Sequence, residues 1–140
     1  MEAALRIAEE EQVTLAFEPE RANVVNTAAK GRALLVAMQS SHLKVVIDPA
    51  HLIVPGDEHQ MSQVLDEAFD LLGEYIVIAH AKDRGADDTF RAAGEGILDY
   101  DQYVRLLRAA SFNGPLILHG LTEGQIDTAL QFLRDKLQRR

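Results

Sequence analysis

Four short apolar runs, each followed by a helix-like segment, restrict the possible folds more than any other feature of this sequence. The runs cover residues 13–17, 43–47, 75–79 and 115–118. The segments with apolar residues at helical intervals cover 27–38, 60–72, 100–109 and 124–137, and a further helix is expected over 2–11. Continuously apolar strands that alternate with helices are typical of a parallel sheet covered by helices. The pattern therefore predicts an α/β protein built from βα units.

Length and composition are consistent with one domain over residues 1–140. Hydrophobic residues make up 47% of the chain, and the absence of cysteine excludes disulfides, thiolate metal sites and a cysteine nucleophile. The 22 acidic and 14 basic residues give a net charge of −8, which argues against a nucleic-acid binder, because such proteins present a basic face. The sequence shows neither a signal peptide nor a membrane-spanning apolar run. We predict a cytoplasmic location without membrane contact.

A side chain that can bind a metal follows each of the four apolar runs. These side chains are Glu18, Asp48, His80 and His119. In a parallel sheet the carboxyl ends of the strands lie along one edge, where α/β proteins build their sites. Strand alternation then places Ala16, Val46, Ile78 and Ile117 beneath them on the same face. The residues expected to face the helices are Leu15, Phe17, Val45, Ile47, Val77, Ala79, Leu116 and Leu118.

Two carboxylates and two imidazoles at one edge predict a site for a divalent cation such as Mn²⁺, Co²⁺, Zn²⁺, Fe²⁺ or Mg²⁺. Each residue also has a simpler interpretation when it is taken singly. A carboxylate directly after a strand commonly caps a turn or a helix, and a lone histidine is commonly structural. The metal hypothesis depends on finding such a residue after every run.

The residues around these positions resemble the second half of the xylose isomerase-like TIM barrels. That superfamily includes sugar-phosphate isomerases, ketose 3-epimerases, inosose dehydratases and zinc-type apurinic endonucleases. The similarity covers residues 13–137. LAFEPE matches the fifth-strand glutamate with Glu18, VVIDPAH matches the sixth-strand pair with Asp48 and His51, and IAHAKD matches the seventh-strand histidine with His80. GEGILDY and GPLILH match the following segment and the eighth strand.

The resemblance implies about half of a (β/α)8 barrel, with four parallel strands and helices on the outer face. It also implies a metal-dependent sugar or sugar-phosphate isomerase or epimerase of carbohydrate metabolism. Glu18, Asp48, His80 and His119 would hold the metal, with Glu18 abstracting the proton and His119 as the opposing acid. His119 replaces a glutamate of the epimerases. A dehydratase fits less well, and so does an endonuclease, because Phe90 replaces the histidine that follows the position of Asp88.

Three further residues are candidates for substrate binding. His51 would hold a substrate hydroxyl, or would pack on Pro55 as a loop histidine. Lys82 and Arg84 would bind a phosphate or carboxylate, or would remain solvated loop charges. Between the first run and the next helix, Asn23 is expected to act as an N-cap or to lie near the site with Glu20.

A half-barrel leaves one sheet face and both edge strands uncovered. A full barrel needs about 250 residues and eight strands. The chain is therefore expected to form a homodimer that completes a barrel, to be a fragment of a longer chain, or to repack, because exposed edges and apolar faces favour aggregation. The rival to an enzyme is a non-catalytic half-barrel remnant that serves as a binding or assembly module.

Overall fold

The computed structural model describes residues 1–56 and 58–138, which form an α/β fold. The elements in chain order are α1 (Glu2–Glu10), β1 (Leu15–Phe17), α2 (Ala28–Met38), β2 (Leu43–Ile47), α3 (Pro49–Leu52), α4 (Glu58–Leu72), η1 (Gly73–Tyr75), β3 (Ile76–Arg84), β4 (Phe90–Ala92), α5 (Tyr100–Ala109), β5 (Leu116–Leu118), η2 (Glu123–Gln125) and α6 (Ile126–Gln138). None of the helices in these residues has the length and apolarity needed to cross a membrane.

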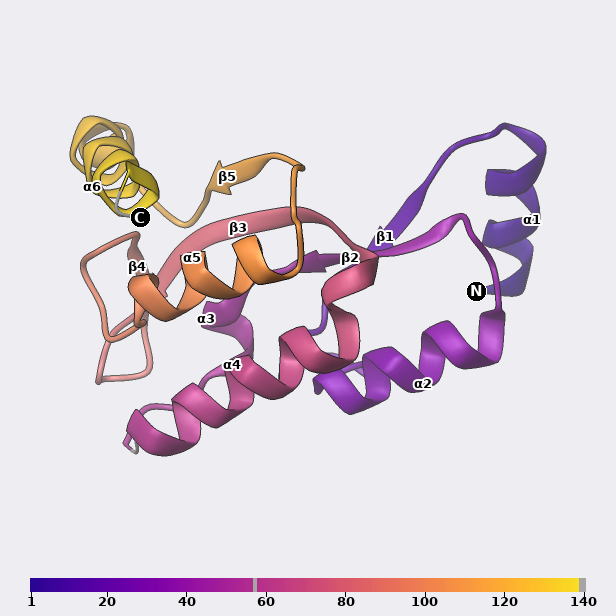
Figure 1. Ribbon diagram of the computed structural model, residues 1–140, viewed down its shortest axis with the longest axis horizontal. Coiled ribbons are helices and arrows are strands. Elements are labelled where there is room, and N and C mark those ends of the chain that lie inside the picture. The colour runs from indigo at the N-terminus through magenta and orange to yellow at the C-terminus, as the bar shows by residue number, and fades with distance from the viewer. Residues whose placement is uncertain (57, 139–140) are drawn as a thin grey trace.

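The four predicted strands form a parallel sheet in the order β1-β2-β3-β5. This arrangement confirms the prediction of parallel βα units. The structure contains a further strand after the third predicted one, which the apolar pattern did not predict. β3 continues to Arg84, and the short strand β4 pairs with its last residues in an antiparallel manner. The sheet therefore has a fifth strand, β4, which lies beside the carboxyl end of β3 (Figure 1).

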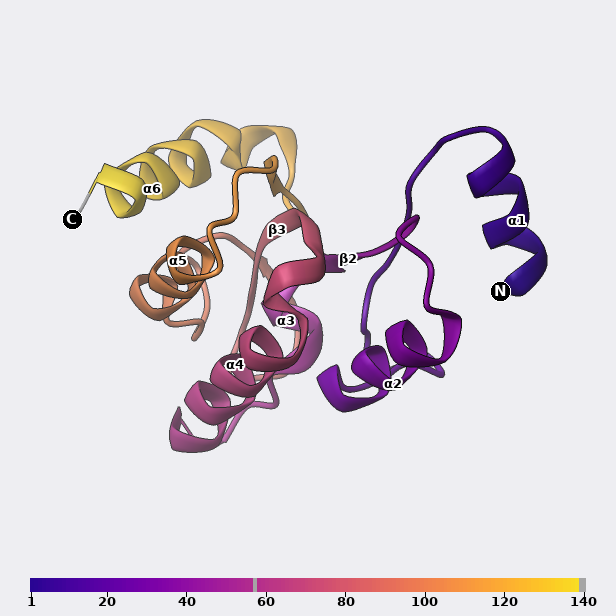
Figure 2. The same ribbon diagram turned by 45° about the vertical axis from the view of Figure 1, so that its right-hand side comes forward.

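The helices α2, α4 and α5 lie on one side of the sheet (Figures 1 and 2). α2 packs on α4, α4 packs on α5, and α6 contacts α5 and β5. α1 lies beyond β1, at the opposite end of the molecule from α6 (Figure 1). Local sequence explains where α2 begins, because the Thr27 hydroxyl accepts a hydrogen bond from the Lys30 amide at 3.2 Å and so caps the helix.

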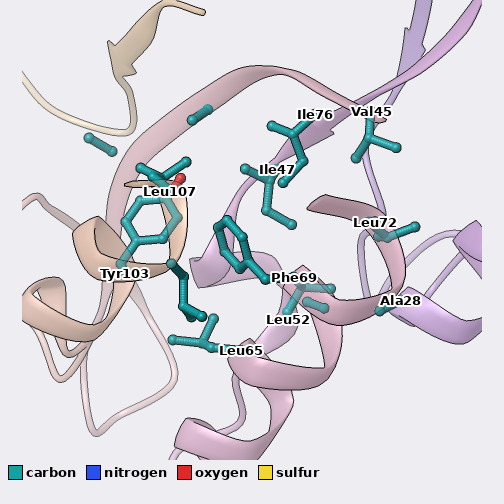
Figure 3. Packing of buried hydrophobic residues seen from close by; sticks show 14 of the residues in the cluster. Ala28, Val45, Ile47, Leu52, Leu65, Phe69, Leu72, Ile76, Tyr103 and Leu107 are labelled. Carbon is teal, nitrogen blue, oxygen red and sulfur yellow. The ribbon is translucent and has the colours of Figure 1, made fainter. Parts of the chain in front are cut away.

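The hydrophobic core fills the layer between the sheet and these helices (Figure 3). Val45 and Ile47 of β2 are fully buried, and they lie above Leu65 and Leu72 of α4. α5 joins the same core through Tyr103, Leu106 and Leu107, and Tyr103 makes an edge-on contact with Phe69 at 6.0 Å between ring centroids. Burial of this layer fixes which way the strand residues point, and so sends the alternate side chains to the other face.

That other face of the sheet is open. Ala16 is exposed, Ile117 is 41% exposed, and Val46 and Ile78 are half-buried, as strand alternation predicts. The expectation for Val77 was wrong. A register shift between Val45 and Val46 pairs Ile76 with Val45, so Ile76 and not Val77 is buried under the helices.

Candidate metal and substrate site

Asp48 lies at the centre of the carboxyl edge of the sheet, directly after β2. Its Oδ1 accepts a hydrogen bond from the Ala50 amide at 2.9 Å and caps the short helix α3. Its Oδ2 is buried and has no hydrogen-bond partner among the described residues. Leaving a buried polar atom unpaired costs free energy, so such an atom calls for an explanation. Asp48 therefore combines a structural role on one oxygen with an uncommitted second oxygen.

Three nitrogen atoms surround this uncommitted oxygen at distances beyond hydrogen bonding. His80 Nδ1 and His51 Nε2 each lie 3.6 Å from Asp48 Oδ2, and Lys82 Nζ lies 3.7 Å from it. Burial raises the pKa of Asp48 above its ordinary value, whereas the Lys82 ammonium acts in the opposite direction. The Asp48 carboxylate is thus surrounded by one ammonium group and two imidazole rings.

The other predicted ligands gather around Asp48. Glu18 Oε1 lies 3.0 Å from His80 Nδ1, and the rings of His80 and His119 are stacked, with centroids 4.9 Å apart and planes at 10°. Asp48, His80 and His119 offer ligand atoms that all lie within 4.8 Å of one another, and so do Glu18, Asp48 and His51. The structure therefore brings the four residues to one edge, with Asp48 common to both groups.

This donor set fits a divalent cation. Carboxylate oxygens and imidazole nitrogens are the ligands of Zn²⁺ and of the other first-row divalent ions, and Mg²⁺ prefers the carboxylates. The Oδ2 of Asp48 is the oxygen that such an ion would take, because no described group donates a hydrogen bond to it.

His51 and Lys82 contact each other beside Asp48. The Lys82 ammonium lies 2.8 Å from His51 Nε2, and His51 Nδ1 lies 3.2 Å from Glu20 Oε1. An ammonium can only donate, so Nε2 accepts, and Nδ1 carries the proton that points at Glu20. Burial lowers the pKa of His51, and the Lys82 charge lowers it further. The pairing with Glu20 was not predicted from the sequence.

Arg84 is held by two partners inside the protein. Its Nη1 donates to the Ala50 carbonyl at 2.7 Å, and its Nε donates to Asp88. Asp88 also pairs with Arg21 at 3.1 Å. The alternative of solvated loop charges for Lys82 and Arg84 was wrong, because both belong to β3 and are 4% and 7% exposed.

Phe90 contacts the predicted site residues, and the sequence did not predict this contact. β4 places it opposite Arg84 in the antiparallel pair. Its ring centroid lies 3.5 Å from Lys82 Nζ and 4.9 Å from the His51 ring. A cavity of about 350 Å³ opens here, and its lining residues are Glu20, Arg21, Ala22, His51, Arg84 and Phe90. Only the pairing of β4 with β3 brings Phe90 here, and a three-residue strand gives little sequence signal.

Asn23 does not cap a helix. Its Nδ2 donates to Glu20 Oε2 at 2.7 Å, and Thr27 caps α2 instead. Glu20 thus has one oxygen toward Asn23 and one toward His51. The other prediction for these residues, that Asn23 and Glu20 lie near the site, agrees with the structure.

Residues behind the site fix the strand that carries His80, Lys82 and Arg84. The Asp83 carboxylate accepts hydrogen bonds from the amides of Arg84, Gly94 and Leu98 at 2.8, 3.1 and 3.0 Å. It therefore folds the segment after β4 back onto β3. From α5, the Tyr103 hydroxyl donates to the His80 carbonyl at 3.0 Å, and the Tyr100 hydroxyl donates to the Lys82 carbonyl at 3.2 Å.

Comparison with known proteins agrees with this architecture. A D-psicose 3-epimerase with D-tagatose from Clostridium cellulolyticum H10 superposes with a TM-score of 0.73 at 20% identity, over 99% of this chain and 54% of that chain. A D-tagatose 3-epimerase-like protein gives 0.79 at 17% identity, over 96% and 50%. The IOLI protein with a bound zinc atom gives 0.70 at 23% identity, over 94% and 51%.

The chain thus spans about half the length of these solved structures. No curated protein sequence matches it. Residues 1–136, nearly the whole chain, match the family model described as xylose isomerase-like TIM barrel. Together with the parallel strands and their order, this match shows that the chain belongs to the xylose isomerase-like TIM barrel family.

Proposed function

We propose that this protein is a divalent-metal-dependent isomerase or epimerase that moves a proton next to the carbonyl of a sugar or sugar phosphate. The observation that carries the proposal is the buried, uncommitted Oδ2 of Asp48, with His80 Nδ1 and His51 Nε2 both 3.6 Å away. The epimerases among the similar structures support the reaction class, and the zinc-bound one supports a metal.

Glu18, Asp48, His80 and His119 are the proposed ligands. A divalent cation held there would polarise the substrate carbonyl and stabilise the negative charge that develops on its oxygen. Glu18 would abstract the proton, because it is only partly buried and its carboxylate is oriented by His80. His119 follows β5 and Glu18 follows β1, at opposite ends of the parallel strand order, so His119 could return a proton from the other side. His51, Lys82 and Arg84 are the proposed substrate-binding residues.

The first test is metal binding in the absence of substrate. Mn²⁺, Co²⁺ or Zn²⁺ should raise the melting temperature of the wild type, since a ligand at 100 times its Kd stabilises the folded state by about 2.7 kcal/mol. Asp48→Asn should lose most of this shift while it keeps an oxygen to cap α3. Asp70→Asn removes an exposed carboxylate from α4 and serves as the control. If no cation shifts the wild-type melting temperature, the metal site is refuted.

The second test concerns the reaction itself. The metal-loaded protein should exchange the hydrogen next to the carbonyl of a ketose or ketose phosphate for deuterium in D₂O, followed by NMR. Glu18→Gln should abolish the exchange and leave the fold intact, because the amide keeps the size of the carboxylate. Exchange in Glu18→Gln at the wild-type rate would contradict the assignment of the base.

A non-catalytic half-barrel module is the second candidate. It is favoured by the coverage of about half of each similar structure and by the open sheet face, where Ala16 and Ile117 are exposed. Such a module would bind the cation without any deuterium exchange. In both cases a second half-barrel is the proposed cover for the open face, supplied by another copy of this chain or by another segment of a longer chain.

A further inference from the structure

A second cavity lies between α4 and α5, on the helix side of the sheet. Its volume of about 470 Å³ is within the range of small-molecule sites. Among the described residues of its wall there is no proposed metal ligand and no proposed substrate-binding residue. We propose that this cavity binds a small organic ammonium ion, with the charged group at Asp99 and Gln102 and the hydrocarbon body on the apolar part of the wall.

The apolar part of the wall comes from three separate segments of the chain. Ile53 follows α3, Met61 and Leu65 belong to α4, and Leu98 precedes α5. Each of these side chains is at most 9% exposed. A hydrocarbon group placed against them would be removed from water, which favours binding.

Gln102 offers a hydrogen-bond acceptor to a ligand in this cavity. The residue is 8% exposed, and its Nε2 donates to the Ser62 carbonyl at 2.9 Å and to Asp66 Oδ1 at 3.1 Å. Both partners can only accept, so the orientation of the amide is fixed and Oε1 lies on its other side. None of the described residues donates a hydrogen bond to Oε1. A ligand that donates would therefore satisfy it.

Asp99 places a negative charge next to this acceptor. Its Oδ1 accepts hydrogen bonds from the amides of Asp101 and Gln102 at 2.9 and 3.0 Å, which holds the carboxylate at the first turn of α5. Its Oδ2 receives no hydrogen bond from any residue that the structure describes. The N–H groups of an ammonium ion could donate both to this carboxylate and to Gln102 Oε1.

The wall offers no lysine or arginine for a competing anion among its described residues. Its other ionisable side chain, His59, is exposed, and His59 Nε2 lies 3.0 Å from Gln63 Nε2. An amide nitrogen can only donate, so this contact suits the neutral imidazole. The net charge of −8 further favours the approach of a cation.

The proposal is tested by NMR titration of the full chain, labelled at the methionine methyl groups and free of added metal. The chain has three methionines, of which Met61 lines the cavity, and Met61→Leu identifies its signal. 2-Phenylethylammonium should shift the Met61 signal and leave those of Met1 and Met38 in place. 2-Phenylethanol, which lacks the charge, should bind about fivefold more weakly. 3-Phenylpropionate should cause no shift. Because no metal or turnover is involved, the result is independent of the proposed function.

Asp99→Asn tests the role of the charge. Asparagine caps a helix about as well as aspartate, so the fold should be kept while the affinity for 2-phenylethylammonium falls about fivefold. Asp101→Asn is the matched control. It removes the same charge two residues further along, where Asp101 pairs with Lys136, and it should leave the affinity unchanged.

Three results would each overturn the proposal. The first is a wild-type Met61 signal that does not respond to 2-phenylethylammonium. The second is wild-type protein that binds 2-phenylethanol or 3-phenylpropionate as tightly as the ammonium ion. The third is a folded Asp99→Asn variant whose affinity equals that of Asp101→Asn. The first and second use the wild type, so they stand even if a variant folds poorly.

Discussion

His119 differs from the other three proposed ligands because it lies exposed at the sheet edge. Its ring is stacked on that of His80, with the ring centroids 4.9 Å apart. Together with Asp48 and His80, it forms one of the two clusters of possible metal ligands. A histidine at this position contributes no negative charge, which leaves the negative charge of the site to Asp48 and Glu18. The site then relies on nitrogen donors more than an all-carboxylate site would, which favours Zn²⁺ or Co²⁺ over Mg²⁺.

Replacing His119 by glutamate should raise the affinity for Mn²⁺ or Mg²⁺ by about tenfold, because it adds one negative charge and a hard oxygen donor. Any epimerase activity should rise with it. Isothermal titration with Mn²⁺ and Zn²⁺ measures the change. His59→Glu makes the same change of charge on α4 and should leave both affinities unaltered. Equal affinities and rates in His119→Glu and the wild type would place residue 119 outside the site.

At the same scale, the sequence predicted the position of Asp48 but left open whether it is a cap or a ligand. The structure shows why a choice between the two could not be made. The amide two residues later engages one oxygen, and burial under the sheet edge leaves the other one free. Such a division between two oxygens depends on tertiary packing. Spacing along the chain does not encode it.

Among the elements, β3 carries more of the proposed site residues than any other, and the segment after β4 packs against it. Gly96 allows that segment to approach β3, because a Cβ on it would lie 2.3 Å from the Arg84 carbonyl oxygen and 2.3 Å from Asp83 Oδ1. The sequence predicted a strand here but ended it at residue 79. Residues 80–84 are mostly polar, which is typical of a loop. Only the tertiary structure shows that β4, α5 and the segment around Leu98 pack against them.

Gly96→Ala should lower the free energy of unfolding by about 1–3 kcal/mol, since the new methyl group meets backbone that cannot easily move. Urea denaturation measures this. Gly124→Ala is the matched control, because a Cβ there has no neighbour within 4 Å, and its effect should be close to zero or slightly stabilising. Equal stability of the two variants would show that the 92–98 segment does not pack on β3 as described.

For the whole molecule, the open sheet face sets the expected assembly. The sequence predicted parallel strands from the alternation of strands and helices. It predicted which strand residues are exposed because the alternation of side chains along a strand is a local property. It could not identify the cover, which depends on surfaces outside the chain. Closing eight strands into a barrel would bury Ala16, Ile117 and their neighbours at roughly 25 cal/mol per Å² of apolar area.

Sedimentation of this chain at micromolar concentration should therefore reveal a dimer, with β1 and β5 pairing across copies. Ile117→Glu should shift the equilibrium to monomer by at least tenfold, because it places a charge in the closed interior. Val36→Glu adds the same charge on the exposed surface of α2 and should remain dimeric. A well-folded monomer of the wild type would refute self-association and favour a longer chain as the source of the missing half.

The strand order also has a consequence for motion. β3 is paired on both sides and again at its end, so the backbone beneath His80 and Lys82 can open only when much of the fold opens. Among the described residues, β1 and β5 are short outer strands that pair with one strand each, so we expect them to open at a lower free-energy cost. Glu18 and His119 therefore follow strands that we expect to be more mobile, whereas Asp48 and His80 are held by the central strands. A cation bound by all four residues would therefore restrict the motion of β1 and β5 relative to the centre of the sheet.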